Sequence, residues 1–432
     1  MWVIMFEKSL KHIIKYILVF ALTAALCFAL LVSSALIPKE AVRENTLRSA
    51  GFFAENEIFC DRITGSAATR IDNYADTITV SIGWCFDEND PLGSTMRAEY
   101  YNNDYENVRD SFAKGLQDSG YARTEYLRYW HGSSAVSRIM HTFTDISGMH
   151  TCAAVLIFTL AAVLLAVLIR FRLYAEAVCS ALALISVSIW FVPDSIQNVW
   201  CFIIMLAAAP VCVLFAMRGR YESVCTVLLI SGVVTNSFDF LTVETLTLLF
   251  PLILVISIKR RKGGSLKDDL IYAAKCCALW LGGYCLMWVL KWVCAAVILN
   301  IDVLPYIGGH ISERMYDRGD IGLAAYLIEM LARNIGCLFP FGYTEPGVIA
   351  AVLLTLVFCF YVFVFRKKGW DKRTVLIFML LGAVVFIRYF VLHNHSYGHY
   401  FFTYRAQASV MLAVLLSAAE ITGARVRHGK KT

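Results

Sequence analysis

Residues 374–405 read TVLIFMLLGAVVFIRYFVLHNHSYGHYFFTYR, and this stretch contains the two features that decide the fold. Residues 374–392 are almost entirely apolar, and about 20 apolar residues are enough for an α-helix to cross a bilayer. A short polar segment follows at 393–401, and a second apolar run begins at residue 402. Because hydrocarbon offers polar groups no hydrogen-bond partner, a polar segment between two spans indicates a membrane-surface site.

The rest of the chain repeats this apolar pattern. Of its 432 residues, 59% are hydrophobic and 17% are charged, and the mean hydropathy is +0.62. Soluble domains are nearer half apolar and a quarter charged. We therefore predict an all-α polytopic membrane protein with a single membrane domain over residues 1–432. It has about ten transmembrane helices, at 13–37, 150–169, 174–193, 198–216, 221–237, 241–258, 271–299, 347–366, 374–392 and 402–423.

Basic residues beside these spans predict the orientation, because Lys and Arg gather on the cytoplasmic side. With the N-terminus inside, every cytoplasmic segment is basic, and the C-terminus also lies inside. These segments are 8–11, 170–172, 218–220, 259–267, 366–373 and 425–431. The prediction is a multi-pass cell-membrane protein with two large extracytoplasmic pieces, a helical first loop at 38–149 and a second at 300–346. Since the net charge of +6 comes from residues beside the spans, no nucleic-acid partner is expected.

The 14 cysteines show no CxxC pair and no Cys/His spacing typical of zinc. Most lie within the spans, where cysteine behaves as a small apolar residue. Cys60 and Cys85 lie in the first loop and could form a disulfide if the compartment is oxidising. The sequence leaves that pairing open.

Asp72 and Asp76 are the first candidates for chemistry, in a protein that is otherwise sparsely charged. Their i, i+4 spacing places both carboxylates on one face of a helix. Such a pair can provide a general base and a partner that orients it. The alternative is a solvated helix start with Asp72 as the N-cap.

Further candidates for substrate binding lie along the outer face. Arg128 and His131 follow and flank aromatic residues, which suits phosphate or sugar recognition or an interfacial belt. Asp239 lies in a short apolar hairpin, where a carboxylate needs a partner. Lys291 could be that partner. Alternatively, flanked by tryptophans, it extends its amine to the membrane surface. Arg314 is a further cation, or a surface partner of Glu313.

The polar segment quoted above is the hardest to explain as structure alone. His393, His395 and His399 occupy one outer turn, and Arg405 begins the last span. No adjacent carboxylate completes a familiar metal-ligand set, so no metal site is predicted, although a divalent cation is left open as a cofactor. Arginine with imidazole donors fits a phosphate better.

These features together resemble GT-C glycosyltransferases, which are polytopic membrane enzymes. The resemblance rests on the anchor, the acidic motif Asp72…Asp76 in a long first outer loop, and the stretch from Asn394 to Arg405. It implies an enzyme of the cell envelope that takes sugar from a polyprenyl-phosphate carrier at the extracytoplasmic face. Asp72 and Asp76 would then be catalytic, and the basic stretch would bind the donor phosphate.

The partners that the resemblance implies are the polyprenyl-phosphate-linked sugar donor, a glycan, lipid or protein acceptor, and membrane lipid. The competing prediction is a transporter or flippase for a lipid-linked or anionic substrate, which uses the same charges without making a bond. A sensory or structural membrane protein is a third reading. The polar groups cluster on one face and no repeated half is visible, which favours the enzyme.

Overall fold

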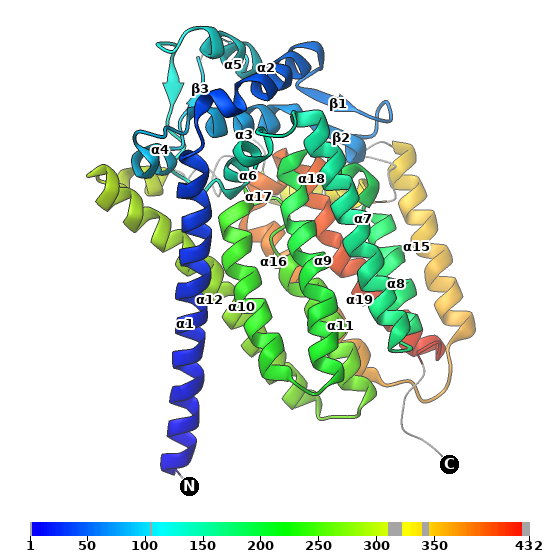
Figure 1. The fold of residues 1–432 in the computed structure, drawn as a ribbon. Helices are drawn as coiled ribbons and strands as arrows, with labels where there is room; N and C mark the ends of the chain where they lie inside the picture. The colour runs from blue at the N-terminus through cyan, green and yellow to red at the C-terminus, as the bar shows by residue number, and fades with distance from the viewer. Residues whose placement is uncertain (1, 104–105, 310–321, 339–344, 426–432) are drawn as a thin grey trace.

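The computed structural model describes residues 2–103, 106–309, 322–338 and 345–425, and in these residues the chain is almost entirely helical. Helices built from the apolar runs form a bundle, and the residues between the first two long helices form a cap on one end of it (Figure 1). The bundle consists of α1 (Trp2–Ala35), α7 (Ile146–Arg170), α8 (Tyr174–Ser186), α9 (Ile196–Met217), α10 (Tyr221–Phe238), α11 (Leu246–Arg261), α12 (Leu266–Leu299), α14 (Leu323–Gly336), α15 (Glu345–Phe365), α16 (Lys372–Val391) and α19 (Ala408–Thr422).

Membrane-length helices bear out the prediction of an all-α membrane protein. Within the described residues, seven helices are long and apolar enough to cross a bilayer. Each of the ten predicted segments contains a helix, but α8 is short and ends before a 3₁₀ turn, η2 (Ile189–Asp194). The helix α11 begins at Leu246 rather than near 241, because residues 239–245 form a loop that is described below.

The cap contains short helices and two small antiparallel ladders that the sequence did not indicate. Its helices are α2 (Lys39–Glu55), α3 (Asn73–Cys85), α4 (Pro91–Arg97), α5 (Val108–Gln117) and α6 (Gly132–Met140), with a 3₁₀ turn η1 (Ala67–Thr69). The strands β1 (Phe59–Asp61) and β2 (Arg70–Asp72) pair with Cys60 opposite Ile71. The strands β3 (Tyr100–Tyr101) and β4 (Arg123–Thr124) pair with Tyr100 opposite Thr124. All 14 cysteines are free thiols, so Cys60 and Cys85 are not joined.

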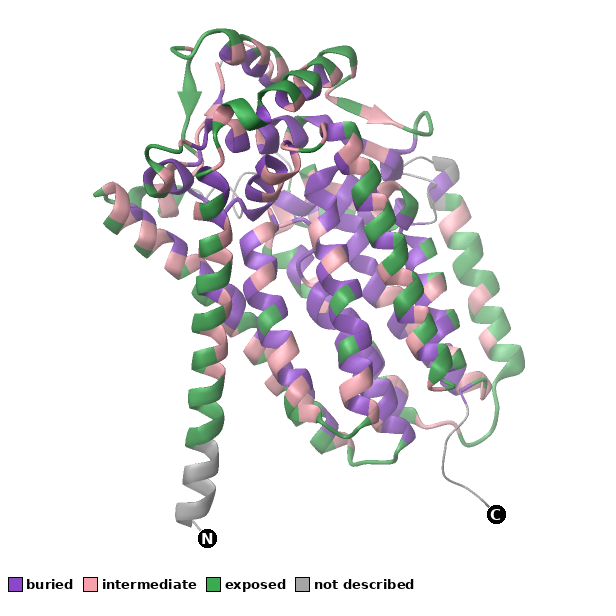
Figure 2. Ribbon diagram, in the orientation of Figure 1, coloured by how far each residue is buried: buried purple, intermediate pink, exposed green. Residues whose placement is uncertain are grey.

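Two glycines bring α10 and α12 unusually close together. A Cβ added to Gly232 would lie 2.2 Å from the carbonyl oxygen of Trp280, and one added to Gly283 would lie 2.9 Å from that of Leu229. Small residues at such crossings let backbones approach within van der Waals contact in a membrane. Figure 2 shows α9 and α11 mostly buried, whereas α1 and α15 are mostly exposed at the periphery. The exposed apolar side chains of α1 and α15 suit contact with lipid.

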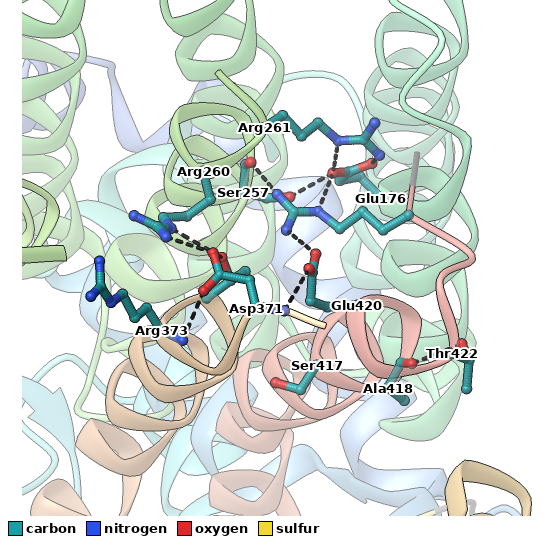
Figure 3. Close-up of polar contacts among 12 residues, drawn as sticks. Glu176, Ser257, Arg260, Arg261, Asp371, Arg373, Ser417, Ala418, Glu420 and Thr422 are labelled. Atoms are coloured by element: carbon teal, nitrogen blue, oxygen red, sulfur yellow. Dashed lines mark hydrogen bonds and ion pairs between the residues drawn. The ribbon is translucent and has the colours of Figure 1, made fainter. Parts of the chain in front are cut away.

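A network of buried ion pairs joins helices at the end of the bundle away from the cap (Figure 3). Glu176 of α8 accepts hydrogen bonds from Arg261 of α11, at 2.6 and 2.8 Å, and forms an ion pair with Arg425. Arg260 donates to Asp371 at 2.7 Å and to Asp269 at 3.0 Å. Every charged group in this network therefore has a partner of opposite charge, and the network links α8, α11, α12, α16 and the chain beyond α19.

Candidate functional site

One cavity of about 560 Å³ lies where the cap meets the bundle. This volume is within the range of ligand sites in proteins. The lining comes from the start of α3, the segment 124–129, the first turn of α9, the loop after α10, and the short helices α17 (His393–Gly398) and α18 (Tyr400–Thr403). In Figure 1, α3 and α6 of the cap lie side by side above the bundle. Thr124 and Glu125, which are exposed, line its rim.

Asp72 and Glu125 are both carboxylates of the cavity lining, and Asp72 is the buried one. It caps α3, and its Oδ1 accepts a hydrogen bond of 2.9 Å from the backbone N–H of Ala75. Its Oδ2 accepts one from the side-chain amide of Gln197. Burial raises the pKa of Asp72 to about 7, although both hydrogen bonds act in the opposite direction. A carboxylate with a pKa near neutrality is suited to proton transfer.

Asp76 is fully buried and is not among the described residues that line the cavity. Its Oδ2 accepts hydrogen bonds from His150 at 2.9 Å and from the backbone N–H of Ile196 at 3.1 Å. Its Oδ1 accepts from the N–H of Gln197 at 3.4 Å. The two predicted catalytic acids therefore differ in environment, since Asp72 faces the cavity and Asp76 holds the first turn of α9.

The segment before α6 places Arg128 in the cavity wall. Its guanidinium carbon lies 5.9 Å and 5.8 Å from the ring centroids of Tyr126 and Tyr129, as the sequence pattern of arginine among aromatics suggests. His131 is buried behind this wall in a left-handed conformation (φ 60°) and donates from Nε2 to the carbonyl of Tyr126 at 2.7 Å. Burial lowers the pKa of His131 to about 3, so the imidazole is neutral and shapes the turn.

The histidines of the polar segment divide between the cavity and its support. His395 and His399 both line the cavity, and their ring centroids are 4.6 Å apart. His395 donates from Nε2 to the carbonyl of Leu241 at 2.8 Å. His393 lies outside the lining and contacts the carbonyl of Phe390 at 3.2 Å.

The loop after α10 forms part of the cavity wall through Phe240. Leu241 has a left-handed backbone (φ 65°), and its carbonyl also accepts a hydrogen bond of 2.6 Å from Arg388. Arg388 forms a buried ion pair of 3.0 Å with Glu244. The polar segment and this loop therefore hold each other in place.

Asp239 and Lys291 do not form the pair that the sequence suggested. Asp239 is buried and accepts hydrogen bonds from Thr242, through both the hydroxyl and the backbone N–H. Lys291 is fully buried and donates to the carbonyl of Met96 at 3.0 Å, beside the ring of Trp130. Each therefore fastens its own local contact, Asp239 within its loop and Lys291 between α12 and α4.

Arg405 lies apart from the phosphate-binding arrangement that the sequence suggested. It is 1% exposed and is not among the described residues that line the cavity. Its Nη2 donates to the carbonyl of Ala68 at 3.3 Å, and its Nε and Nη1 have no hydrogen-bond partner within the described part of the chain. Arg314 falls outside the described residues.

The cavity also contains residues that the sequence did not single out. Gln197 lies in the first turn of α9, Tyr306 follows α12, and Tyr74, Tyr100 and Phe402 add aromatic surface. A glutamine at a span end and scattered tyrosines have no sequence signal, because only the fold brings them together. Among the described residues, no group of three His, Cys, Asp or Glu side chains is arranged to hold a metal ion.

Comparisons of the chain with models of known protein families, with curated proteins and with solved structures find no match. Function therefore has to be inferred from the cavity itself.

Proposed function

We propose that this chain is a membrane glycosyltransferase that takes a sugar from a polyprenyl-phosphate carrier at the extracytoplasmic face. The observation that carries the proposal is the composition of one cavity. It combines the Asp72 carboxylate with Arg128 and two imidazoles, although these residues are as far apart in sequence as 72 and 399. A base, a cation and an aromatic wall are the groups that sugar transfer from a lipid phosphate needs.

Asp72 would act as the general base. The hydroxyl oxygen of the acceptor attacks the anomeric carbon, the bond from that carbon to the phosphate oxygen breaks, and Asp72 takes the hydroxyl proton. The leaving group is the polyprenyl phosphate. A base works best with a pKa near the working pH, and burial raises the pKa of Asp72 to about 7.

Arg128 would bind the departing phosphate. A guanidinium presents two parallel N–H groups to a phosphate, and such bonds are among the strongest in proteins. His399 borders the same cavity and would offer a further donor, and His395, whose Nε2 is bonded to Leu241, would offer its Nδ1 when protonated. The tyrosines and Phe402 supply flat apolar faces against which a sugar ring can pack. Arg128 replaces Arg405 in this role because Arg405 is buried away from the lining.

The membrane placement is part of the same proposal. Ten helices would cross the bilayer with both termini in the cytoplasm, so that the cap and cavity lie outside. Support comes from the basic loops, which fall at the end of the bundle away from the cap. Support for a lipid-linked substrate comes from an apolar groove of about 240 Å³ between α14 and α15. The helix α14 also contacts α17 of the cavity, because the side-chain amide of Asn334 donates to the carbonyl of Ser396.

The test is release of polyprenyl phosphate by protein reconstituted in liposomes with a radiolabelled polyprenyl-phosphate sugar and a mixture of glycan and lipid acceptors. We expect sugar transfer by the wild type, transfer reduced about 10²–10⁴-fold in Asp72→Asn, and normal transfer by Asp110→Asn, an exposed carboxylate of the cap. Movement of the intact donor between leaflets without release of polyprenyl phosphate would contradict the proposal and favour the transporter.

A further inference from the structure

The starts of α3 and α9 are bonded to each other in both directions. The backbone N–H of Asp72 donates to Ser195 Oγ at 2.8 Å, while Asp76 accepts from the first N–H groups of α9, those of Ile196 and Gln197. The first N–H groups of a helix have no partner within it, so a carboxylate there both satisfies them and meets a favourable dipole. Ser195 itself makes no side-chain cap of α9. Asp76 takes that place.

This arrangement holds both the backbone and the side chain of Gln197. Its backbone is held by Asp76, and its side chain is 5% exposed and lines the cavity. Its amide nitrogen donates to Asp72 Oδ2, while the N–H of Ala75 donates to Oδ1. Both oxygens of Asp72 therefore receive a donor, and the amide is the donor that comes from a different helix.

We propose that Gln197 is a positioning residue for Asp72: its amide holds the carboxylate in the cavity wall and favours the ionised form. Asp76, held in turn by His150, keeps Gln197 in place. As a statement about catalysis this rests on the proposed function. As a statement about the ionisation of Asp72 it stands separately, and the two are tested separately below.

Several charged or titratable groups surround Asp72, and Gln197 can be removed without changing any of them. Asp76 of α3 raises its pKa, and Arg70 of β2 lowers it. The cavity lining also includes Arg128, Glu125, His395 and His399, with Tyr74 near the carboxylate on α3. Its other titratable groups are Tyr100, Tyr126, Tyr129 and Tyr306. A hydrogen bond to the charged form lowers the pKa of an acid, so loss of the amide must raise that of Asp72.

The test is labelling by a lipophilic carbodiimide, which reacts with a carboxyl group in its protonated form and marks it as an N-acylurea. Labelling is followed from about pH 5 to 9, a range that covers a raised carboxyl pKa. Mass spectrometry of the peptide that contains Asp72 then gives the labelling midpoint, which is the pH at which labelling has fallen by half. For Gln197→Met, we expect the midpoint to rise by about one to two pH units, the size of one hydrogen bond to a charged group. The matched control is Gln407→Met. Gln407 is also buried, but it donates to Asn334, and its loss should leave the midpoint unchanged.

A second variant keeps the inference testable if Gln197→Met does not fold. Gln197→Leu removes the same amide and replaces it with an apolar side chain of different shape, so the midpoint must again rise. An unchanged midpoint in either folded variant overturns the inference. Where transfer is measurable, the pH profile of the rate must shift with the labelling midpoint. If transfer is absent but labelling shifts, the proposed function fails while the positioning of Asp72 stands.

Discussion

Two aspartates begin helices at opposite ends of the bundle, and their surroundings differ. Asp72 caps α3 at the cavity, and Asp371 caps α16 in the network of Figure 3. Asp371 accepts hydrogen bonds from Arg260 and Thr374, which together outweigh its burial and lower its pKa to about 2. Asp72 is bonded to two neutral donors, and burial raises its pKa to about 7.

The two regions also differ in whether their other buried charges have a counter-charge. At the far end, Glu176, Arg261 and Arg425 are buried together as ion pairs. At the cavity end, Arg388 and Glu244 form a buried ion pair, but neither Lys291 nor Arg405 forms one within the described residues, and each of these two donates to a backbone carbonyl. Paired charges hold helices together, whereas a buried charge without a counter-charge is costly to the folded state. The two ends should therefore respond differently to substitution.

The largest difference is expected between two matched variants, Asp72→Asn and Asp269→Asn. The first should reduce sugar transfer by about 10²–10⁴-fold, the usual contribution of a general base, with little change in thermal stability. The second breaks the bonds of Asp269 to Arg260 and Lys259 and should lower stability while sparing turnover per folded molecule. Unfolding followed by fluorescence, beside the transfer assay, measures both. Equal changes in transfer rate and in stability for the two variants would contradict the difference proposed between the two ends of the bundle.

Arg261→Met tests the far end alone. Removing one partner of a buried ion pair typically costs about 3–5 kcal/mol, because the remaining charge stays buried. Glu176 retains Arg425, so the loss should fall toward the lower part of that range. Thermal and denaturant unfolding in nanodiscs measure it. A variant as stable as the wild type would show that the network contributes little.

Arg128→Lys tests the cavity end through ligand binding. Lysine keeps the charge but loses the two-pronged donor, and a hydrogen bond to a charged group contributes about 1.5–3 kcal/mol. Affinity for a radiolabelled polyprenyl-phosphate sugar should fall about tenfold to a hundredfold. The matched control is Arg48→Lys, an exposed arginine of the cap that should bind as the wild type does. Equal affinities for both variants would remove Arg128 from the site.

The pH dependence should have opposite signs at the two ends. As pH rises from about 4 to 7, Asp72 stays protonated in the folded protein but ionises when unfolded, so its contribution to stability falls while turnover rises. The contribution of Asp371 is present above its unfolded pKa and is lost as pH falls toward about 2. Unfolding midpoints of Asp72→Asn and Asp371→Asn in both pH windows, together with transfer rates in the upper one, measure the contributions of the two aspartates. A transfer rate that does not change through pH 7 would contradict the role of Asp72.

The smallest effect is expected for Arg405→Met. Replacing a buried charge that lacks a counter-charge by an apolar side chain of similar volume is often neutral or stabilising. We expect unchanged or higher stability and unchanged donor affinity, measured by the same unfolding and binding assays. A loss of donor affinity would return Arg405 to the site and reverse its assignment here.

The apolar spans were predictable because a 20-residue hydrophobic run has few alternatives to a helix. Asp72, Arg128, His395 and His399 were also marked in the sequence: Asp72 by its spacing from Asp76, Arg128 by its aromatic neighbours, and the histidines by their place between two spans. What the sequence could not distinguish was Asp72 from Asp76, or Arg128 from Arg405. Those pairs differ in what faces them, and Gln197, Phe240 and Tyr306 come from parts of the chain that only folding brings together.

The hydrogen bond from the Tyr404 hydroxyl to the carbonyl of Ala68 joins segments that are 336 residues apart. During synthesis, at about 5–20 residues per second, the first outer loop therefore waits roughly 17–67 s before its partner has been made. Throughout that interval the start of α3 lacks the part of the cavity wall that α17 and α18 provide. The chain thus has a built-in delay between insertion of its first helix and completion of its cavity, and a nascent chain that stops before α17 would lack His395 and His399 as well as this closing bond.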